Sequence, residues 1–190
     1  MERRRIGYLI FFMSSFFLLS GCTYHVTKQI AERLDPDVLY KEYKITPADL
    51  SKGSKCAAPP AVKIVNSETR NGDYLVLKNP PRTLFINPRE MMDGVSTYLK
   101  KGYERIGIRI DDRSTKVLQI KMVNLQSIVG GWSFEGRFKM ELTIPEIKYL
   151  KTYEGMDNAA EGLNAPAYAI HAVVRDVIND ADVQNYILCR

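Results

Sequence analysis

Cysteines and histidines are the residues of this chain best suited to do chemistry, and there are few of them. The 190 residues include three cysteines, Cys22, Cys56 and Cys189, and two histidines, His25 and His171. No cluster of cysteines or carboxylates accompanies either histidine in a zinc-site pattern, so each is expected to be an ordinary surface or core residue. No Gly-x-Ser-x-Gly motif, phosphate loop or paired-carboxylate signature is present. We therefore predict no metal, no cofactor and no catalytic residue, and no enzyme; a hydrolase would need a nucleophile and a base that only the fold could bring together.

The first cysteine ends a leader-like segment. Met1–Arg5 carries three arginines, and the apolar run Ile6–Leu19 has 14 residues, fewer than the about 20 that a membrane-spanning helix needs. Leu19-Ser20-Gly21-Cys22 follows, with two small residues before a thiol that could accept a diacylglyceryl group. This tetrapeptide resembles the bacterial lipobox, which implies cleavage before Cys22 and lipid attachment to it. The alternative is an uncleaved N-terminal anchor beside an ordinary cysteine.

The residue after Cys22 and the charge balance bear on location and partners. In the sorting pattern of Gram-negative lipoproteins, Asp at this position favours the inner membrane, so Thr23 implies the periplasmic face of the outer membrane. Acyl chains such as palmitate would hold the protein there, since each buried CH₂ contributes about 0.8 kcal/mol. Without the leader, 24 basic side chains stand against 21 acidic ones. This near balance argues against nucleic acid as a partner.

Cys56 and Cys189 are left over once Cys22 carries a lipid. Two thiols in an oxidising periplasm are expected to form a disulfide. The bond would close a loop of roughly 130 residues and contribute about 4–5 kcal/mol in the chain-entropy model. Two separate thiols are the alternative, because the sequence does not show whether the two Cα atoms come within ~7 Å.

Three segments follow from these features: a signal peptide at 1–21, an acylated tether at 22–60 and a single domain at 61–190. Prolines at positions 36, 47, 59 and 60 interrupt the tether, although Lys28–Leu34 could form two helical turns.

In the domain, Asn87 and Pro88 predict the start of a helix whose apolar face continues to Ile106. A second helix is expected over Pro166–Ile178, followed by a short turn, Val183–Leu188, that Asp182 could cap.

Period-two patterns predict the strands. Even positions are apolar and odd positions mostly polar throughout Trp132–Pro145, which indicates a strand with one face on a core. In Val117–Ser127 the apolar parity switches near Met122, which predicts a β-bulge. Ile147–Met156 is the expected partner strand of Trp132–Pro145. Further strands are expected at Ala61–Asn66, Tyr74–Leu77 and Thr83–Ile86.

The elements together predict an α+β domain, with an antiparallel sheet of about four to five strands and two helices packed on one face. The other face would be polar or partly covered by the tether. Tyr149 and Tyr153 share one face of their strand and are a possible contact surface. Tyrosine is also common in strands, so an ordinary structural role is the alternative.

The order of these elements resembles that of the YajG-like family of uncharacterised bacterial lipoproteins, over roughly Ala61–Leu188. The resemblance rests on the lipobox, the helix Asn87–Ile106, the strand meander and the final helix. The opening Cys22-Thr23-Tyr24-His25 is also similar to LptE, the lipopolysaccharide-assembly lipoprotein, which has a comparable two-helix, one-sheet domain. Neither resemblance implies a catalytic motif or a settled function.

Two functions fit an anchored domain without a catalytic motif. The first is a structural or assembly module that holds an envelope protein partner at the outer membrane. The second is a binding module that grips a small envelope ligand, such as a lipid, glycan or peptide, on the open sheet face. An apolar pocket lined by residues such as Trp132 and Phe134 would favour the second hypothesis.

Overall fold

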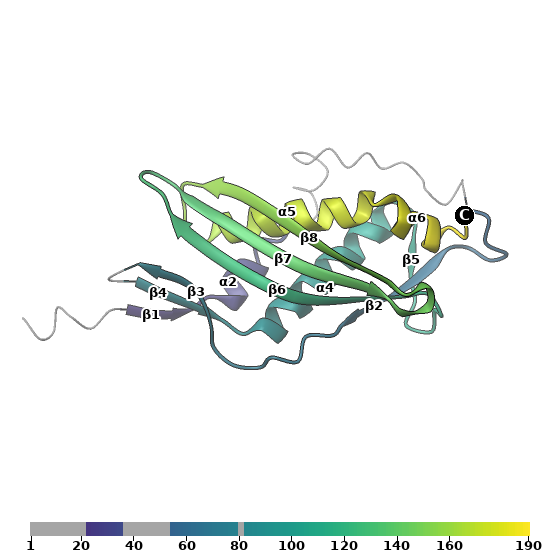
Figure 1. The fold of residues 1–190 in the computed structure, drawn as a ribbon, viewed down its shortest axis with the longest axis horizontal. Helices are drawn as coiled ribbons and strands as arrows, with labels where there is room; N and C mark the ends of the chain where they lie inside the picture. Colours follow the sequence, from purple (N-terminus) through teal and green to yellow (C-terminus); the bar gives the residue numbers. More distant parts are fainter. Residues whose placement is uncertain (1–21, 36–53, 80–81) are drawn as a thin grey trace, which may run out of the picture.

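The computed structural model describes residues 22–35, 54–79 and 82–190 (Figure 1). The predicted leader and residues 36–53 of the predicted tether lie outside this part of the chain. Two sheets and four α-helices form within it: β1 (Cys22–His25), α2 (Thr27–Ala31), β2 (Ala61–Asn66), β3 (Tyr74–Asn79), β4 (Arg82–Ile86), α4 (Pro88–Arg105), β5 (Arg109–Ile110), β6 (Val117–Val129), β7 (Phe134–Ile144), β8 (Tyr149–Ala159), α5 (Asn164–Asn179) and α6 (Ala181–Ile187), with a short 3₁₀ turn, η2 (Pro145–Ile147), before β8. The predicted α+β class is confirmed.

The larger sheet has five strands in the order β5-β2-β6-β7-β8. β6, β7 and β8 form the predicted antiparallel meander. β2 instead runs parallel to both β5 and β6. The reason is the long connection between β2 and β5, in which α4 carries the chain back to the same end of the sheet, as parallel pairing requires.

β6 carries the predicted bulge. Its register against β7 shifts between Met122 and Asn124, so the side chains that face the core change from even to odd positions. Leu118, Ile120 and Met122 are buried before the bulge, and Leu125 is buried after it. The bulge therefore keeps apolar side chains on the core side as far as Leu125.

α4 and α5 pack on one face of the five-stranded sheet (Figure 1). α4 begins as predicted, because the Asn87 side chain accepts hydrogen bonds from the backbone N–H groups of Arg89 and Glu90. The cap of α6 differs from the prediction. Asp180, not Asp182, accepts the N–H groups of Asp182 and Val183, because α6 starts two residues earlier than expected and Asp182 lies in its first turn.

The second sheet holds three strands in the order β1-β4-β3. β1 pairs in parallel with β4 from Cys22 opposite Arg82 onward. The chain then enters the core, where Val26, Ile30 and Leu34 are buried. These three residues are spaced by four, which is the spacing of one helical face. Residues 22–35, predicted as the start of a tether, thus supply a strand and a helix to the domain.

Candidate functional site

Cys22 is exposed and forms no disulfide in the structure. It opens β1, which lies at an edge of the three-stranded sheet. In the sequence the apolar run Ile6–Leu19 ends three residues earlier. The predicted attachment residue therefore stands where the chain enters the fold, with no long spacer between it and the first strand.

A cavity of about 780 Å³ begins two residues after Cys22. Its walls come from the three-stranded sheet, from the start of α2, from the first residue of β7 and from the loop after β8. The apolar part of the lining includes Val26, Leu77, Leu84, Phe134, Ala160 and Leu163. Val26, Leu77 and Leu84 also belong to the buried core, so the cavity is a continuation of that core toward the surface.

The loop after β8 shapes one wall of the cavity. Gly162 lies against the ring of Phe134, and a Cβ atom at position 162 would come within 3.2 Å of it. The carbonyl oxygen of Gly162 accepts a hydrogen bond of 3.4 Å from the buried Ser127 hydroxyl. Asn164 then ties the end of this loop to the turn that follows α2, since its Oδ1 accepts a 2.6 Å bond from Arg33 Nε. These contacts hold Phe134 at the edge of the cavity.

Polar side chains stand around the apolar lining: His25, Gln29, Asn79, Arg82 and Glu161. His25 lies 3.4 Å from the Asp73 carboxylate and stacks on Phe85. Arg82 supplies a permanent positive charge in the strand that pairs with Cys22. A mostly apolar cavity with a few polar groups at its rim is the usual form of a site for a small apolar or amphiphilic ligand.

The structure places the two predicted pocket residues differently. Phe134 lines the cavity, whereas Trp132 is 100% exposed and lies in the turn between β6 and β7. The cavity also lies beside the three-stranded sheet and not on the open face of the larger sheet, where ligand binding was predicted. That open face carries charged residues such as Glu135, Arg137 and Lys139, which are at least partly exposed.

The prediction of a contact surface at Tyr149 and Tyr153 is wrong for Tyr153. Tyr153 is only 5% exposed, and both hydroxyls donate to Asp180 Oδ2, at 3.3 Å from Tyr149 and 3.0 Å from Tyr153. Lys151 Nζ donates to the same oxygen at 2.6 Å. Their shared strand face turns toward the helices, so both rings serve the anchoring of α6.

In the cluster formed by Tyr149, Lys151, Tyr153 and Asp180, the positive charge of Lys151 balances the negative charge of Asp180. Desolvation opposes ionisation of Asp180, but the hydrogen bonds from Lys151, the Val183 amide and Tyr153 outweigh it, so the pKa of Asp180 is lowered. Burial raises the pKa of Tyr153, and its hydrogen bonds with Tyr149 and Asp180 add to the effect. Asp180 therefore acts as an ionised helix cap with neutral tyrosines beside it, which is a structural role.

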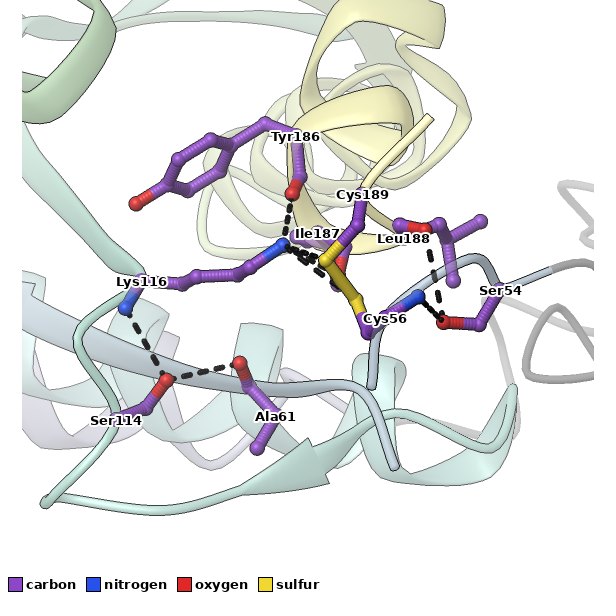
Figure 2. Close-up of a disulfide and its surroundings, with 9 residues drawn as sticks. All are labelled: Ser54, Cys56, Ala61, Ser114, Lys116, Tyr186, Ile187, Leu188 and Cys189. Atoms are coloured by element: carbon purple, nitrogen blue, oxygen red, sulfur yellow. Dashed lines mark hydrogen bonds between the residues drawn. A yellow bond between two sulfur atoms is a disulfide. The ribbon is translucent and has the colours of Figure 1, made fainter. Parts of the chain in front are cut away.

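Cys56 and Cys189 form a disulfide, with their Cα atoms 5.1 Å apart, as predicted (Figure 2). Lys116 reaches into the same corner. Its Nζ lies 2.8 Å from Cys189 Sγ, donates to the Ile187 carbonyl at 3.1 Å and also contacts the Tyr186 carbonyl. Burial lowers the pKa of Lys116. The lysine holds the C-terminal end of α6 beside the start of β6, and the disulfide joins that end to the segment before β2.

The two histidines have different surroundings. His25 is at the cavity, and His171 is fully buried in α5, where its Nδ1 contacts the Tyr98 hydroxyl. Burial lowers the pKa of His171 to about 4. Within 22–35, 54–79 and 82–190, no three His, Cys, Asp or Glu side chains are grouped as metal ligands.

Sequence reasoning missed most of the cavity residues. Tyr24 comes from the predicted tether and Leu77 from a predicted short strand, whereas Arg82 lies just before a predicted strand and was assigned to no element. The spacing of Val26 and Ile30 was the one available signal, because it indicated that the first segment packs on the domain.

No helix in the described ranges combines the length and apolar composition needed to span a membrane. No protein-family model matches the chain, and no curated protein matches it significantly. Among solved structures, one described as "Crystal structure of uncharacterized protein" is similar over 61% of this chain and 85% of its own, with 5% sequence identity and a TM-score of 0.34.

Proposed function

We propose that this protein is a lipid-anchored module of the bacterial envelope that binds the aliphatic chain of an amphiphilic ligand. The cavity of about 780 Å³ beside β1 carries this proposal. Its volume lies within the roughly 300–1,000 Å³ typical of small-molecule sites. It favours ligand binding over a purely structural role, which would require no such cavity.

The chemistry of the lining suggests the kind of ligand. Leu77, Leu84 and Phe134 offer an apolar surface on which an alkyl chain would lose its contact with water, a gain of about 0.8 kcal/mol for each buried CH₂. Arg82 could then pair with an anionic head group at the rim, since guanidinium groups bind carboxylates and phosphates in a bidentate manner. A fatty acid or a lipid with an anionic head fits both features.

The proposed anchor is the lipid on Cys22, at the periplasmic face of the outer membrane. The lipobox resemblance and Thr23 support it, and the exposure of Cys22 leaves the sulfur open to modification. Mass spectrometry of the protein extracted from membranes tests this part directly. We expect the mass of a chain that starts at Cys22 and carries acyl groups. A parent protein without acyl groups on Cys22, or a Cys22→Ser variant that is both cleaved and fractionated like the parent, would overturn it.

Ligand binding is tested by titrating the detergent-solubilised full-length protein with a fluorescent fatty acid. We expect saturable binding, and we expect Gln29→Trp to weaken it, because the larger side chain would fill the cavity from α2. Lys28→Trp is the matched control, since Lys28 is exposed on the same helix and does not line the cavity. Equal affinities for the two variants would contradict the proposal.

The head-group contact has its own test. Arg82→Gln should weaken binding of the anionic probe by at least about tenfold, because a hydrogen bond to a charged group contributes about 1.5–3 kcal/mol. A fatty alcohol of the same chain length should bind the variant and the parent alike. Arg113→Gln, in an exposed turn away from the cavity, is the control. If all three proteins bound the anionic probe equally, Arg82 would have no role in recognition.

A further inference from the structure

The turn between β6 and β7 exposes an apolar tip. Trp132, the single tryptophan of the chain, is 100% exposed, and Ile128 and Val129 are 40% and 43% exposed. We name residues Ile128–Trp132 the hairpin tip. The backbone there is held in a tight turn, because the Gly130 N–H donates to the Ser133 carbonyl at 2.7 Å. A hydrogen-bonded turn therefore fixes the backbone that carries these exposed side chains.

Burial in the core does not explain these side chains, which point outside the fold. The sequence between Lys121 and Glu135 contains no charged residue, so the end of the hairpin lacks the charges that usually keep an exposed strand pair in water. A clustered, uncharged and exposed apolar group of this kind usually marks a contact with a partner or a membrane.

The hairpin tip lies at the end of the molecule where the chain enters the fold. Figure 1 shows the β6–β7 turn and the start of β1 at the same end of the long axis. The cavity lining links the two segments. Tyr24, two residues after Cys22, and Phe134, two residues after Trp132, line the same cavity.

The sequence indicates what lies beyond this end. The apolar run Ile6–Leu19 stops three residues before Cys22. The membrane attachment proposed above would place a bilayer next to β1, whether Cys22 carries a lipid or the apolar run is retained as an anchor. Tryptophan is enriched at the interface between lipid head groups and acyl chains, where its ring and its N–H group are both accommodated.

We infer that the hairpin tip inserts into the interfacial region of the leaflet that holds the N-terminal anchor. The inference rests on the membrane attachment in the proposed function, but not on the cavity ligand. The anchor keeps the tip close to the lipid surface, so its insertion is an intramolecular step that needs little affinity of its own. Two contacts would fix the orientation of the domain and bring the cavity next to the leaflet.

The single tryptophan makes the test direct. The full-length protein, reconstituted in phosphatidylcholine vesicles, is compared with vesicles whose acyl chains are brominated near the head group. We expect Trp132 emission to be blue-shifted from that of hydrated indole, quenched by the brominated lipid and protected from aqueous iodide. Emission of a hydrated indole that iodide quenches freely would overturn the inference.

A matched pair of variants separates insertion from mere proximity. Ile128→Lys places a charge in the tip and should abolish most of the quenching by brominated lipid. Val123→Lys, at a residue 44% exposed on the same strand and further from the turn, should leave it unchanged. Equal quenching in both variants would contradict insertion of the tip.

Flotation of the vesicles distinguishes failure of the anchor from failure of the tip. Protein that floats with the vesicles but shows a hydrated Trp132 overturns the tip contact alone. Protein that does not float overturns the anchor and the tip contact together. The cavity is judged separately by the fatty-acid titration, which needs no vesicles.

Discussion

Gly155 of β8 lies directly under the backbone of Ala169 in α5, and a Cβ atom at position 155 would come within 2.2 Å of the Ala169 carbonyl oxygen. A similar approach occurs at Gly136 of β7, where a Cβ atom would come within 2.0 Å of the Ala165 carbonyl. The two glycines let α5 lie close against the sheet and so fix the position of the loop that precedes it. That loop forms one wall of the cavity.

Replacement of Gly155 by alanine should therefore destabilise the domain. The added methyl group meets backbone and not a flexible side chain, so we expect the free energy of unfolding to fall by at least about 2 kcal/mol. Gly131→Ala is the control, because no atom lies within 4 Å of its Cβ position, and its effect should stay within about 0.5 kcal/mol. Urea denaturation monitored by circular dichroism measures both. Equal urea midpoints for Gly155→Ala and Gly131→Ala would contradict the prediction, because they would show that α5 moves away from the added methyl group without a loss of stability.

Loss of the Cys56–Cys189 bond should lower stability substantially. The bond joins residues separated by 133 positions, and the chain-entropy model gives about 5 kcal/mol for a loop of this length. Cys189→Ser should reproduce the effect of dithiothreitol, whereas Cys22→Ser should not change the free energy of unfolding, since Cys22 is exposed and forms no disulfide. An unfolding midpoint that reductant leaves unchanged would contradict this prediction.

Acid should destabilise the protein through His171 before the carboxylates titrate. Burial lowers its pKa from 6.5 to about 4, so the unfolded chain takes up the proton first as the pH falls. The resulting loss in the free energy of unfolding is close to zero above pH 6.5. It grows as the pH falls toward 4, where it reaches about 3 kcal/mol. Denaturation curves at pH 7.5, 6 and 5 would show the decline. In the His171→Gln variant the free energy of unfolding should depend less on pH over this range. An unchanged pH dependence in that variant would exclude His171 as the cause.

Two buried tyrosines should respond oppositely to removal of the hydroxyl. Among the described residues, the Tyr103 hydroxyl has no hydrogen-bond partner, although the ring is buried. Tyr103→Phe should therefore leave stability unchanged or raise it by about 1 kcal/mol. Tyr153→Phe removes a hydrogen bond to the Asp180 carboxylate and should lower stability by about 1–2 kcal/mol. Thermal unfolding of both variants, side by side, tests the contrast. A loss in Tyr103→Phe as large as in Tyr153→Phe would contradict it.

Local patterns in the sequence determined the long elements of the fold. Alternation along β7 fixed both its existence and its buried side chains, because period two leaves one face for the core. The parity change at Met122 identified the bulge in β6. Asn87 and Pro88 located the start of α4. Each of these signals lies within one segment, so no knowledge of the other segments is needed.

Tertiary structure alone decided how the segments combine. Tyr149 and Tyr153 share a strand face in the sequence, but only packing shows that this face meets α6 and Asp180. Residues 22–35 look like a spacer because they are short and are followed by prolines, yet their three apolar side chains complete the core. The cavity brings β1 together with β7 and the loop after β8, both of which follow β1 more than 100 residues later in the chain. Such contacts follow from the arrangement of several elements at once, and no local pattern records them.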